Sequence, residues 1–313
     1  MVKVGVIIPL YNKAQHIARA LDSVLSQTYK DYEVIVVDDG STDDGLEIVK
    51  RYTDPRLRVV SQENTGPGAA RNKGVAESTS QFLSFLDADD EWMPIFLETC
   101  VKVLEDNPDC DVAASAYFLG VQGKDVTDIF RDYGMAEGPW RLKADISDYQ
   151  LQHAIYILHS SSALFKRGVV EKYGGFYTKN HCRNGEDFYL WIQVMFNHKI
   201  YRILKPLYWY HLEASELGLE SPAEHQLHPF LTDIEPIREN CPDDLKELLE
   251  RFLSQFALSI SHECVAGGSF YKVRYLMKHF PLMKEFRWEY AKLRLKLAWP
   301  GLIPVVRYMK KVV

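Results

Sequence analysis

The sequence predicts an α/β fold in which a mostly parallel sheet is flanked by helices, followed by a helical extension at the C-terminal end. Over residues 4–90, short apolar runs alternate with segments whose apolar residues recur at helical spacing. This alternation is typical of a parallel sheet with right-handed crossovers. From residue 243 onward the pattern is helical. The chain has 313 residues, 47% hydrophobic and 26% charged, which is an ordinary globular composition.

The expected strands and helices of the first part follow the chain in order. A buried run from Val4 predicts a first strand that Pro9 stops, and Ser41 or Thr42 is expected to cap the second helix. Strands are expected at 4–9, 32–37, 57–61, 82–86 and 111–119. Helices are expected at 17–25, 69–77 and 94–106, and the second helix should run from its cap at Ser41 or Thr42 to about residue 52.

The second part is less regular. Residues 120–150 have weak periodicity and are interpreted as a variable insert near the site. A short strand is expected at 161–166, a helix at 186–198, two strands at 201–204 and 207–210, and a loop-rich segment at 218–242. We expect a catalytic domain over 1–215, and a loop followed by a basic helical region over 216–313.

Acidic side chains follow two of the expected strands. Asp38 and Asp39 end the second strand, and Asp87, Asp89 and Asp90 follow the run 82–86. Ligands bind at the carboxyl ends of strands in open α/β sheets, and clustered carboxylates favour Mg²⁺ or Mn²⁺. For an isolated Asp-x-Asp, a solvated acidic turn is the alternative. No GxGxxG and no GxxxxGK[ST] is present, which disfavours a dinucleotide site and a P-loop.

Compartment and partners are constrained by composition. The five cysteines show no CxxC spacing, so we expect reduced thiols in a cytoplasmic protein. No apolar run is long enough to span a bilayer or to act as a signal peptide.

The C-terminal tail is strongly basic. Residues 272–313 contain 11 Lys and Arg but only Glu285 and Glu289 as acids, whereas the whole chain carries −6. Basic residues interleaved with aromatic and aliphatic ones suit an interfacial helix on an anionic membrane, while Pro300 and Pro304 argue against a spanning helix. The alternative is a helical cap on the catalytic domain. Nucleic acid is disfavoured as a partner because the rest of the chain is acidic.

Five segments, taken together, resemble family 2 glycosyltransferases with the GT-A fold, and they cover roughly residues 1–210. The segments are Val6-Ile7-Ile8-Pro9-Leu10-Tyr11-Asn12, Val36-Val37-Asp38-Asp39-Gly40-Ser41-Thr42-Asp43, Gly68-Ala69-Ala70-Arg71-Asn72-Lys73-Gly74, Phe85-Leu86-Asp87-Ala88-Asp89-Asp90 and Gly185-Glu186-Asp187-Phe188-Tyr189-Leu190-Trp191.

The resemblance assigns roles to the acidic and basic residues. It implies that Asp187 is the catalytic base with Glu186 beside it; a helix-start pair stabilised by the dipole is the alternative. It implies that Asp39 accepts from the nucleotide base, where an Asx-turn is the alternative. Arg71 would meet the nucleotide or diphosphate, or lie on a helix surface instead.

The same resemblance assigns the remaining site residues. Pro9 and Tyr11 would line the base pocket, or only end a strand, and Asp87 and Ala88 would contact the donor. Asp89 and Asp87 would hold Mn²⁺ or Mg²⁺. His211 stands where the family often has an arginine, and it would be a further metal ligand or a packed histidine.

The implied activity is inverting transfer of a sugar from a nucleoside diphosphate donor, with UDP-sugars favoured, to a saccharide or lipid-linked glycan in surface polysaccharide synthesis. Two alternatives stay open. One is a non-catalytic nucleotide-sugar-binding protein on the same fold, and the other is a metal-dependent nucleotidyl or phosphoryl transfer enzyme.

Overall fold

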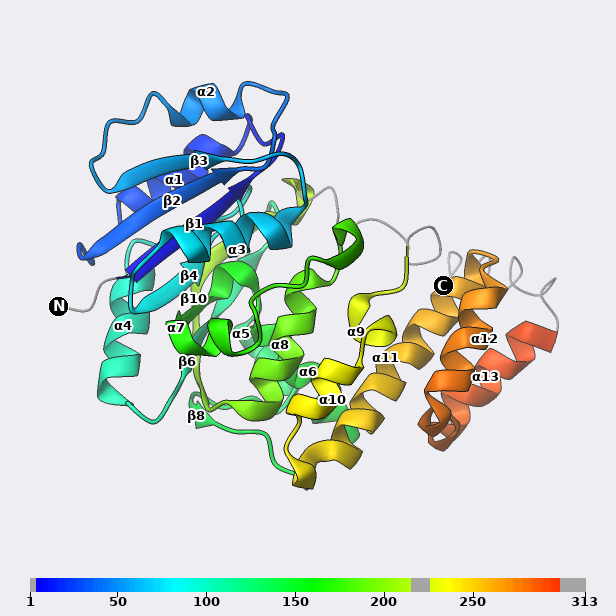
Figure 1. The fold of residues 1–313 in the computed structure, drawn as a ribbon. Coiled ribbons are helices and arrows are strands. Elements are labelled where there is room, and N and C mark those ends of the chain that lie inside the picture. The colour runs from blue at the N-terminus through cyan, green and yellow to red at the C-terminus, as the bar shows by residue number, and fades with distance from the viewer. Residues whose placement is uncertain (1–3, 215–225, 299–313) are drawn as a thin grey trace. The chain divides into compact units, whose positions relative to one another are not determined.

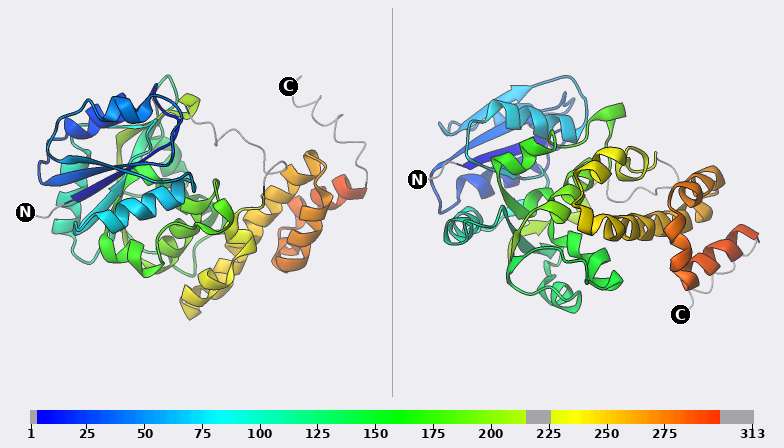
Figure 2. Two further views of the ribbon diagram at one scale, coloured as in Figure 1. Left: turned by 45° about the horizontal axis from the view of Figure 1, so that its top comes forward. Right: turned by 60° about the horizontal axis from the view of Figure 1, so that its bottom comes forward.

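The chain divides into two compact units, Met1–Gly218 and Leu219–Val313 (Figure 1). The structure is a computed structural model, and the residues it describes are 4–214 and 226–298. The first unit is built on one ten-stranded sheet with the strand order β3-β2-β1-β4-β9-β6-β10-β5; β7 pairs with β6, and β8 pairs with β10. Helices flank this sheet (Figure 2), which confirms the predicted α/β class.

The first half of the sheet is parallel and carries the buried apolar runs. Its strands are β1 (Val4–Leu10), β2 (Tyr32–Asp38), β3 (Leu57–Ser61) and β4 (Phe82–Phe85). The connecting helices are α1 (Ile17–Leu25), α2 (Gly45–Val49) and α3 (Pro67–Glu77). Because β1 pairs with β2 on one side and β4 on the other, the acids that follow β2 and β4 lie at the same edge of the sheet, as predicted.

Two details of this half differ from the sequence prediction. Pro9 does not stop β1, since it stays in register with Val37 of β2. The pairing of β1 with β4 ends at Ile7, so a proline beyond that point removes no donor that β4 requires. Neither Ser41 nor Thr42 caps α2, because that helix begins at Gly45 after Asp44.

The second half of the sheet is mixed. β6 (Val112–Leu119) is parallel to β10 (Ile200–Tyr210), whereas β9 (Ala163–Lys166) is antiparallel to both β4 and β6. The two strands predicted at 201–204 and 207–210 are one strand, with irregular register around Pro206. β5 (Glu91–Trp92) pairs antiparallel with β10, and the helices are α4 (Phe96–Asp106), α7 (Arg167–Lys172) and α8 (Glu186–Asn197).

The weakly periodic insert has regular structure of its own. It contains β7 (Lys124–Asp125), α5 (Thr127–Asp132), β8 (Gly138–Trp140) and α6 (Asp148–His153). β7 pairs antiparallel with β6, and β8 pairs antiparallel with β10. The elements are too short to produce a clear period in the sequence.

The second unit is helical, as predicted from residue 243 onward, within its described residues. Its helices are α9 (Pro229–Thr232), α10 (Glu235–Asn240), α11 (Lys246–Ala266), α12 (Phe270–His279) and α13 (Arg287–Ala298). The first two lie in the segment expected to be loop-rich. Pro300, Pro304 and the last basic residues fall outside the described part. Within residues 4–214 and 226–298, no helix combines the length and apolarity needed to cross a bilayer.

Candidate active site

A buried guanidinium links two of the predicted motifs. Arg71, on α3, donates from Nη2 to Oδ1 of Asp87 at 2.6 Å and from Nη1 to Oε1 of Glu186 at 2.8 Å. Its side chain is 5% exposed, that of Glu186 is 7% exposed, and that of Asp87 is 34% exposed. The fork geometry of arginine allows it to hold one carboxylate on each side. The acid after β4 and the first residue of α8 therefore meet at one cation.

Local backbone structure brings α8 this close to α3. Gly185 takes a left-handed conformation with φ 81° and lets the chain turn directly into α8. At Gly68 a Cβ atom would lie 2.7 Å from the carbonyl oxygen of Tyr177 and 3.0 Å from Cγ of Glu186. The glycine thus permits the contact that places Glu186 beside Arg71.

The electrostatics of the α8 acids follow from this packing. Burial and the charge of Asp187 raise the pKa of Glu186, Arg71 opposes the rise, and the pKa lies at about 7. Asp187 is only partly buried, and its Oδ1 accepts from the N–H of Phe188 at 2.6 Å. Glu186 is therefore tied to Arg71, whereas Asp187 is the more accessible of the two carboxylates.

The carboxylate of Asp39 accepts hydrogen bonds from the loop before α3. Its Oδ1 accepts from Nε2 of Gln62 at 2.8 Å and from the N–H of Thr65 at 2.9 Å, and its Oδ2 accepts from the N–H of Gly66 at 2.9 Å. The neighbouring Asp38 accepts at Oδ1 from the N–H of Ser41, three residues on, at 3.0 Å, whereas an Asx-turn would join residues two apart. The structure therefore shows Asp39 fixing the segment that leads into α3.

The other acids after β4 have separate partners. Asp89 forms an ion pair with Lys13, with Oδ2 and Nζ 2.9 Å apart, and the same ammonium donates to the carbonyl of Ala214 at 2.7 Å. Burial is the first cause that raises the pKa of Asp89, and the charge of Asp87 adds to it. Asp90 is buried and accepts from Oγ of Ser161 at 2.7 Å and from the N–H of His211 at 3.1 Å.

His211 is held in an orientation that suits a metal ligand. Its Nδ1 lies 2.8 Å from Oε1 of Glu213, and its ring stacks on Trp209 with an interplanar angle of 4°. Its Nε2 is buried without a hydrogen-bond partner. A carboxylate at Nδ1 leaves Nε2 as the acceptor atom of the ring, which is the arrangement common at metal-bound histidines.

The predicted metal ligands are nevertheless not assembled. Among the residues that the structure describes, no three His, Cys, Asp or Glu side chains are grouped so that they could hold a metal ion. The reason is that Asp87 is paired with Arg71 and Asp89 with Lys13. Nε2 of His211 has no hydrogen-bond partner and lies 3.8 Å from Oε1 of Glu91. This nitrogen and the oxygens of Asp87 and Asp89 fit Mn²⁺ or Mg²⁺ in type. Binding would require Lys13 to leave Asp89.

The remaining predicted residues lie at the same strand ends. Pro9 is the last residue but one of β1, Tyr11 is 41% exposed, and Ala88 is buried. The turn after Tyr11 is fixed by Asn12, whose Oδ1 accepts from the N–H of Thr42 at 2.8 Å. The loop that carries the exposed Tyr11 therefore contacts the segment that follows β2.

Three residues near these acids were missed from the sequence. Lys13 and Ser161 contact Asp89 and Asp90 as described above. The ring of His159 contacts those of Tyr117 and Tyr210, with centroids 5.2 and 5.5 Å away. Burial lowers the pKa of His159, while the charges of Asp187 and Asp87 oppose this. Lys13 could have been found from the sequence, because it directly follows the motif segment that ends at Asn12. No sequence pattern indicates Ser161 or His159.

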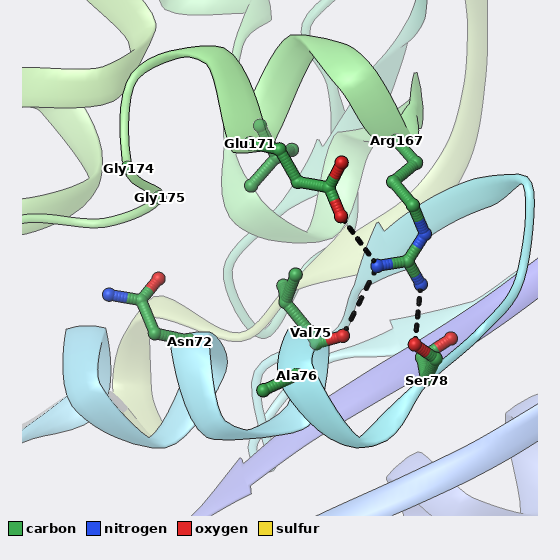
Figure 3. A pocket seen from close by; sticks show the side chains of 9 residues that line it. Asn72, Val75, Ala76, Ser78, Arg167, Glu171, Gly174 and Gly175 are labelled. Atoms are coloured by element: carbon green, nitrogen blue, oxygen red, sulfur yellow. Dashed lines mark hydrogen bonds and ion pairs between the residues drawn. The ribbon is translucent and has the colours of Figure 1, made fainter.

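A surface pocket of about 430 Å³ lies elsewhere, between α3 and α7 (Figure 3). None of the predicted site residues lines it. Its two charged side chains, Arg167 and Glu171, pair with each other (Figure 3). Arg167 also donates to the carbonyls of Val75 at 3.2 Å and Ser78 at 2.9 Å (Figure 3). These contacts satisfy carbonyls at the end of α3, so Arg167 has a structural explanation.

Comparison with known proteins decides the family. Residues 5–174 match the family model described as glycosyl transferase family 2. The chain belongs to this family. A relative from Escherichia coli strain K12, described as uncharacterized glycosyltransferase YibD, is 33% identical over 177 residues, which are 54% of this chain and 50% of that protein. Putative glycosyltransferase EpsH of Bacillus subtilis is 28% identical over 226 residues, covering 68% of this chain and 62% of EpsH.

Solved structures show that this family 2 member has the predicted GT-A fold. S. aureus TarS 1-349 in complex with UDP-GlcNAc matches with a TM-score of 0.64 at 23% identity, over 81% of this chain and 71% of that one. Mannosyltransferase PcManGT from Pyrobaculum calidifontis, in complex with GDP-Man and Mn2+, matches with a TM-score of 0.59 at 22% identity, over 95% and 87%. The chain spans about half the length of the first curated relatives that it matches.

Proposed function

We propose that this chain transfers a glycosyl group, with inversion, from a nucleoside diphosphate sugar to a hydroxyl group of an acceptor. The observation that carries the proposal is the Asp87–Arg71–Glu186 bridge. It joins the acid at the end of β4 to the start of α8, where Asp187 lies. A donor diphosphate beside Asp87 and an acceptor hydroxyl beside Asp187 would then share one site.

The proposed reaction exchanges one bond to the anomeric carbon for another. The acceptor oxygen attacks this carbon from the face opposite the diphosphate, the bond to the diphosphate oxygen breaks, and the nucleoside diphosphate leaves with the electron pair. Asp187 takes the acceptor proton as the base. Glu186 holds Arg71 in place. A guanidinium held in this way stabilises the negative charge that grows on the leaving group.

A divalent cation fits the donor side of the site. Asp89, Asp87 and Nε2 of His211 would hold Mn²⁺ or Mg²⁺, which acts as a Lewis acid toward the leaving diphosphate. Glu213 orients His211 for this role through its contact with Nδ1. The solved PcManGT complex contains Mn2+, which supports the same type of ion here.

The same proposal includes the nucleotide-binding residues, the donor class and the acceptor. Pro9, Tyr11 and Ala88 would surround the donor, with Asp39 accepting from uracil N3–H through the second lone pair of Oδ2. UDP-sugars are therefore favoured, and the TarS complex with UDP-GlcNAc supports this donor class. The acceptor would be a saccharide or lipid-linked glycan in surface polysaccharide synthesis. We place catalysis in residues 1–215, at the cytoplasmic face of a membrane that the C-terminal region contacts peripherally.

A donor screen tests this function. The chain is incubated with UDP-, GDP- and ADP-sugars in Mn²⁺ or Mg²⁺, and release of the nucleoside diphosphate is followed with and without EDTA. We expect release from a UDP-sugar that depends on the metal. Absence of release from every donor, together with calorimetric binding of UDP, would favour the non-catalytic nucleotide-sugar-binding alternative.

A further inference from the structure

Helix α13 of the second unit exposes two large apolar side chains. Six large hydrophobic side chains are exposed among the described residues, and Trp288 and Leu295 of α13 are 72% and 52% exposed. These two residues are seven positions apart, which places them within about 20° of one another around a helix. We call the stripe that they form, together with Ala291, the α13 outer face.

The opposite side of the helix already has a packing partner. Leu293 is fully buried, and it lies about 140° around the helix from Trp288. On the same helix the carbonyl of Glu289 lies 3.1 Å from Nε2 of His262 on α11. The core of the unit therefore uses one side of α13, and the outer face is not needed for that packing.

Cations lie on both sides of the outer face. Lys292 follows Trp288 by one turn, with its ammonium 5.1 Å from the indole centroid, while Arg287 and Arg294 are exposed on the other side. The part of the chain from α12 to α13 is basic overall. Between residues 270 and 298 the cations are Lys272, Arg274, Lys278, Lys284, Arg287, Lys292, Arg294 and Lys296, and the acids are Glu285 and Glu289.

We propose, as a refinement that rests on the peripheral membrane contact in the proposed function, that the α13 outer face binds an anionic lipid bilayer at its surface. Apolar side chains lie on both sides of α13, with Leu293 in the core and Trp288 and Leu295 exposed. The exposed tryptophan and leucine, flanked by Lys and Arg, are the side-chain types that contact a membrane surface. The indole ring is suited to the headgroup level, and the flanking cations attract anionic lipids. Nucleic acid would account for the cations but not for the exposed leucine, so the bilayer explains more of the surface.

Vesicle flotation tests the proposal on the full chain without any substrate. Vesicles of phosphatidylcholine alone, or with phosphatidylglycerol, are mixed with wild type and with the double variant Trp288→Ala/Leu295→Ala. A matched control is Val121→Ala/Tyr149→Ala, which removes two side chains that are 73% and 54% exposed on the first unit. We expect wild type and control to float with the anionic vesicles at low salt and less at high salt.

The expected effects are large enough to measure. Burying one large apolar side chain is worth about tenfold or more in binding, so the α13 double variant should bind at least roughly tenfold more weakly. Lys292→Gln/Arg294→Gln should lose roughly fivefold per charge. Lys50→Gln/Lys102→Gln, on exposed side chains of the first unit, should bind like wild type.

A spectroscopic readout separates direct contact from misfolding. Tryptophan emission should shift to shorter wavelength when anionic vesicles are added, and Trp288→Phe should remove that shift while flotation persists. The proposal is overturned if wild type stays with the soluble fraction at low salt, or if the α13 double variant floats as wild type does. It is also overturned if the chain binds a DNA duplex but not the vesicles.

Discussion

Replacing Arg71 with methionine should strongly destabilise the first unit. The change leaves Glu186 and Asp87 without the cation that contacts them at 2.8 and 2.6 Å. Removing one partner of a buried ion pair typically costs about 3–5 kcal/mol, because the remaining charge stays buried and unpaired. Methionine fills a similar volume, so most of the loss should come from electrostatics rather than from a cavity.

The loss should grow as the pH rises. Glu186 has a folded pKa of about 7 against an ordinary value of 4.5, so its ionisation already works against folding as pH rises through this window. Arg71 lowers the pKa of Glu186, and its removal therefore extends the window to higher pH. We expect a loss of about 3–5 kcal/mol at pH 8, where Glu186 would be ionised, and a smaller loss at pH 6, where most of Glu186 is protonated.

Urea unfolding of the full chain at the two pH values measures this effect. Arg71→Lys keeps the charge and should lose less than Arg71→Met. Arg58→Met is the matched control, because Arg58 is 41% exposed and pairs with Glu77 at the surface, where an ion pair is worth about 0–1 kcal/mol. A loss below about 1 kcal/mol for Arg71→Met, equal at both pH values, would refute the electrostatic reasoning.

Three further predictions concern catalysis. Asp89→Ala should lose most transfer activity while the chain stays folded, since we propose that this acid holds the metal; full activity of the variant, or of wild type in excess EDTA, would remove the metal role. Asp187→Asn should lower transfer by roughly 10²-fold or more in a coupled assay while calorimetry shows unchanged donor binding; near wild-type turnover would direct attention to Glu186. Asp39→Ala should erase most of a preference for UDP over GDP in calorimetry, and tighter GDP binding by wild type would contradict the uridine assignment.

The sequence was sufficient for the regular part of the fold. The run Val4–Leu10 and the helix Ile17–Leu25 could be predicted because both faces of β1 are buried and α1 has one buried stripe. The antiparallel insertion of β9 between β4 and β6 could not be predicted. A four-residue strand has no period that reveals its direction, and its neighbours lie far away in the sequence.

The site could be predicted in composition but not in pairing. The five motifs identified Asp87, Arg71 and Glu186 separately, and the structure adds that Arg71 joins the other two. The sequence pattern does not indicate that Lys13 forms an ion pair with Asp89, because this contact depends on how the loop after β1 packs against the loop after β4. The hydrogen bonds from residues 62–66 to Asp39 could not be predicted either. A carboxylate can accept from a nucleotide base or from a backbone N–H, and the sequence does not distinguish the two.

The ion pair between Lys13 and Asp89 bears on the folding stability of the first unit in the absence of metal. Lys13 and Arg71 supply two positive charges to the acids that follow β4, so these acids do not depend on a divalent ion to relieve their repulsion. Folding and metal loading should then be separate events. A chelator would stop the enzyme without melting it, and adding the metal back would restore turnover with no refolding step.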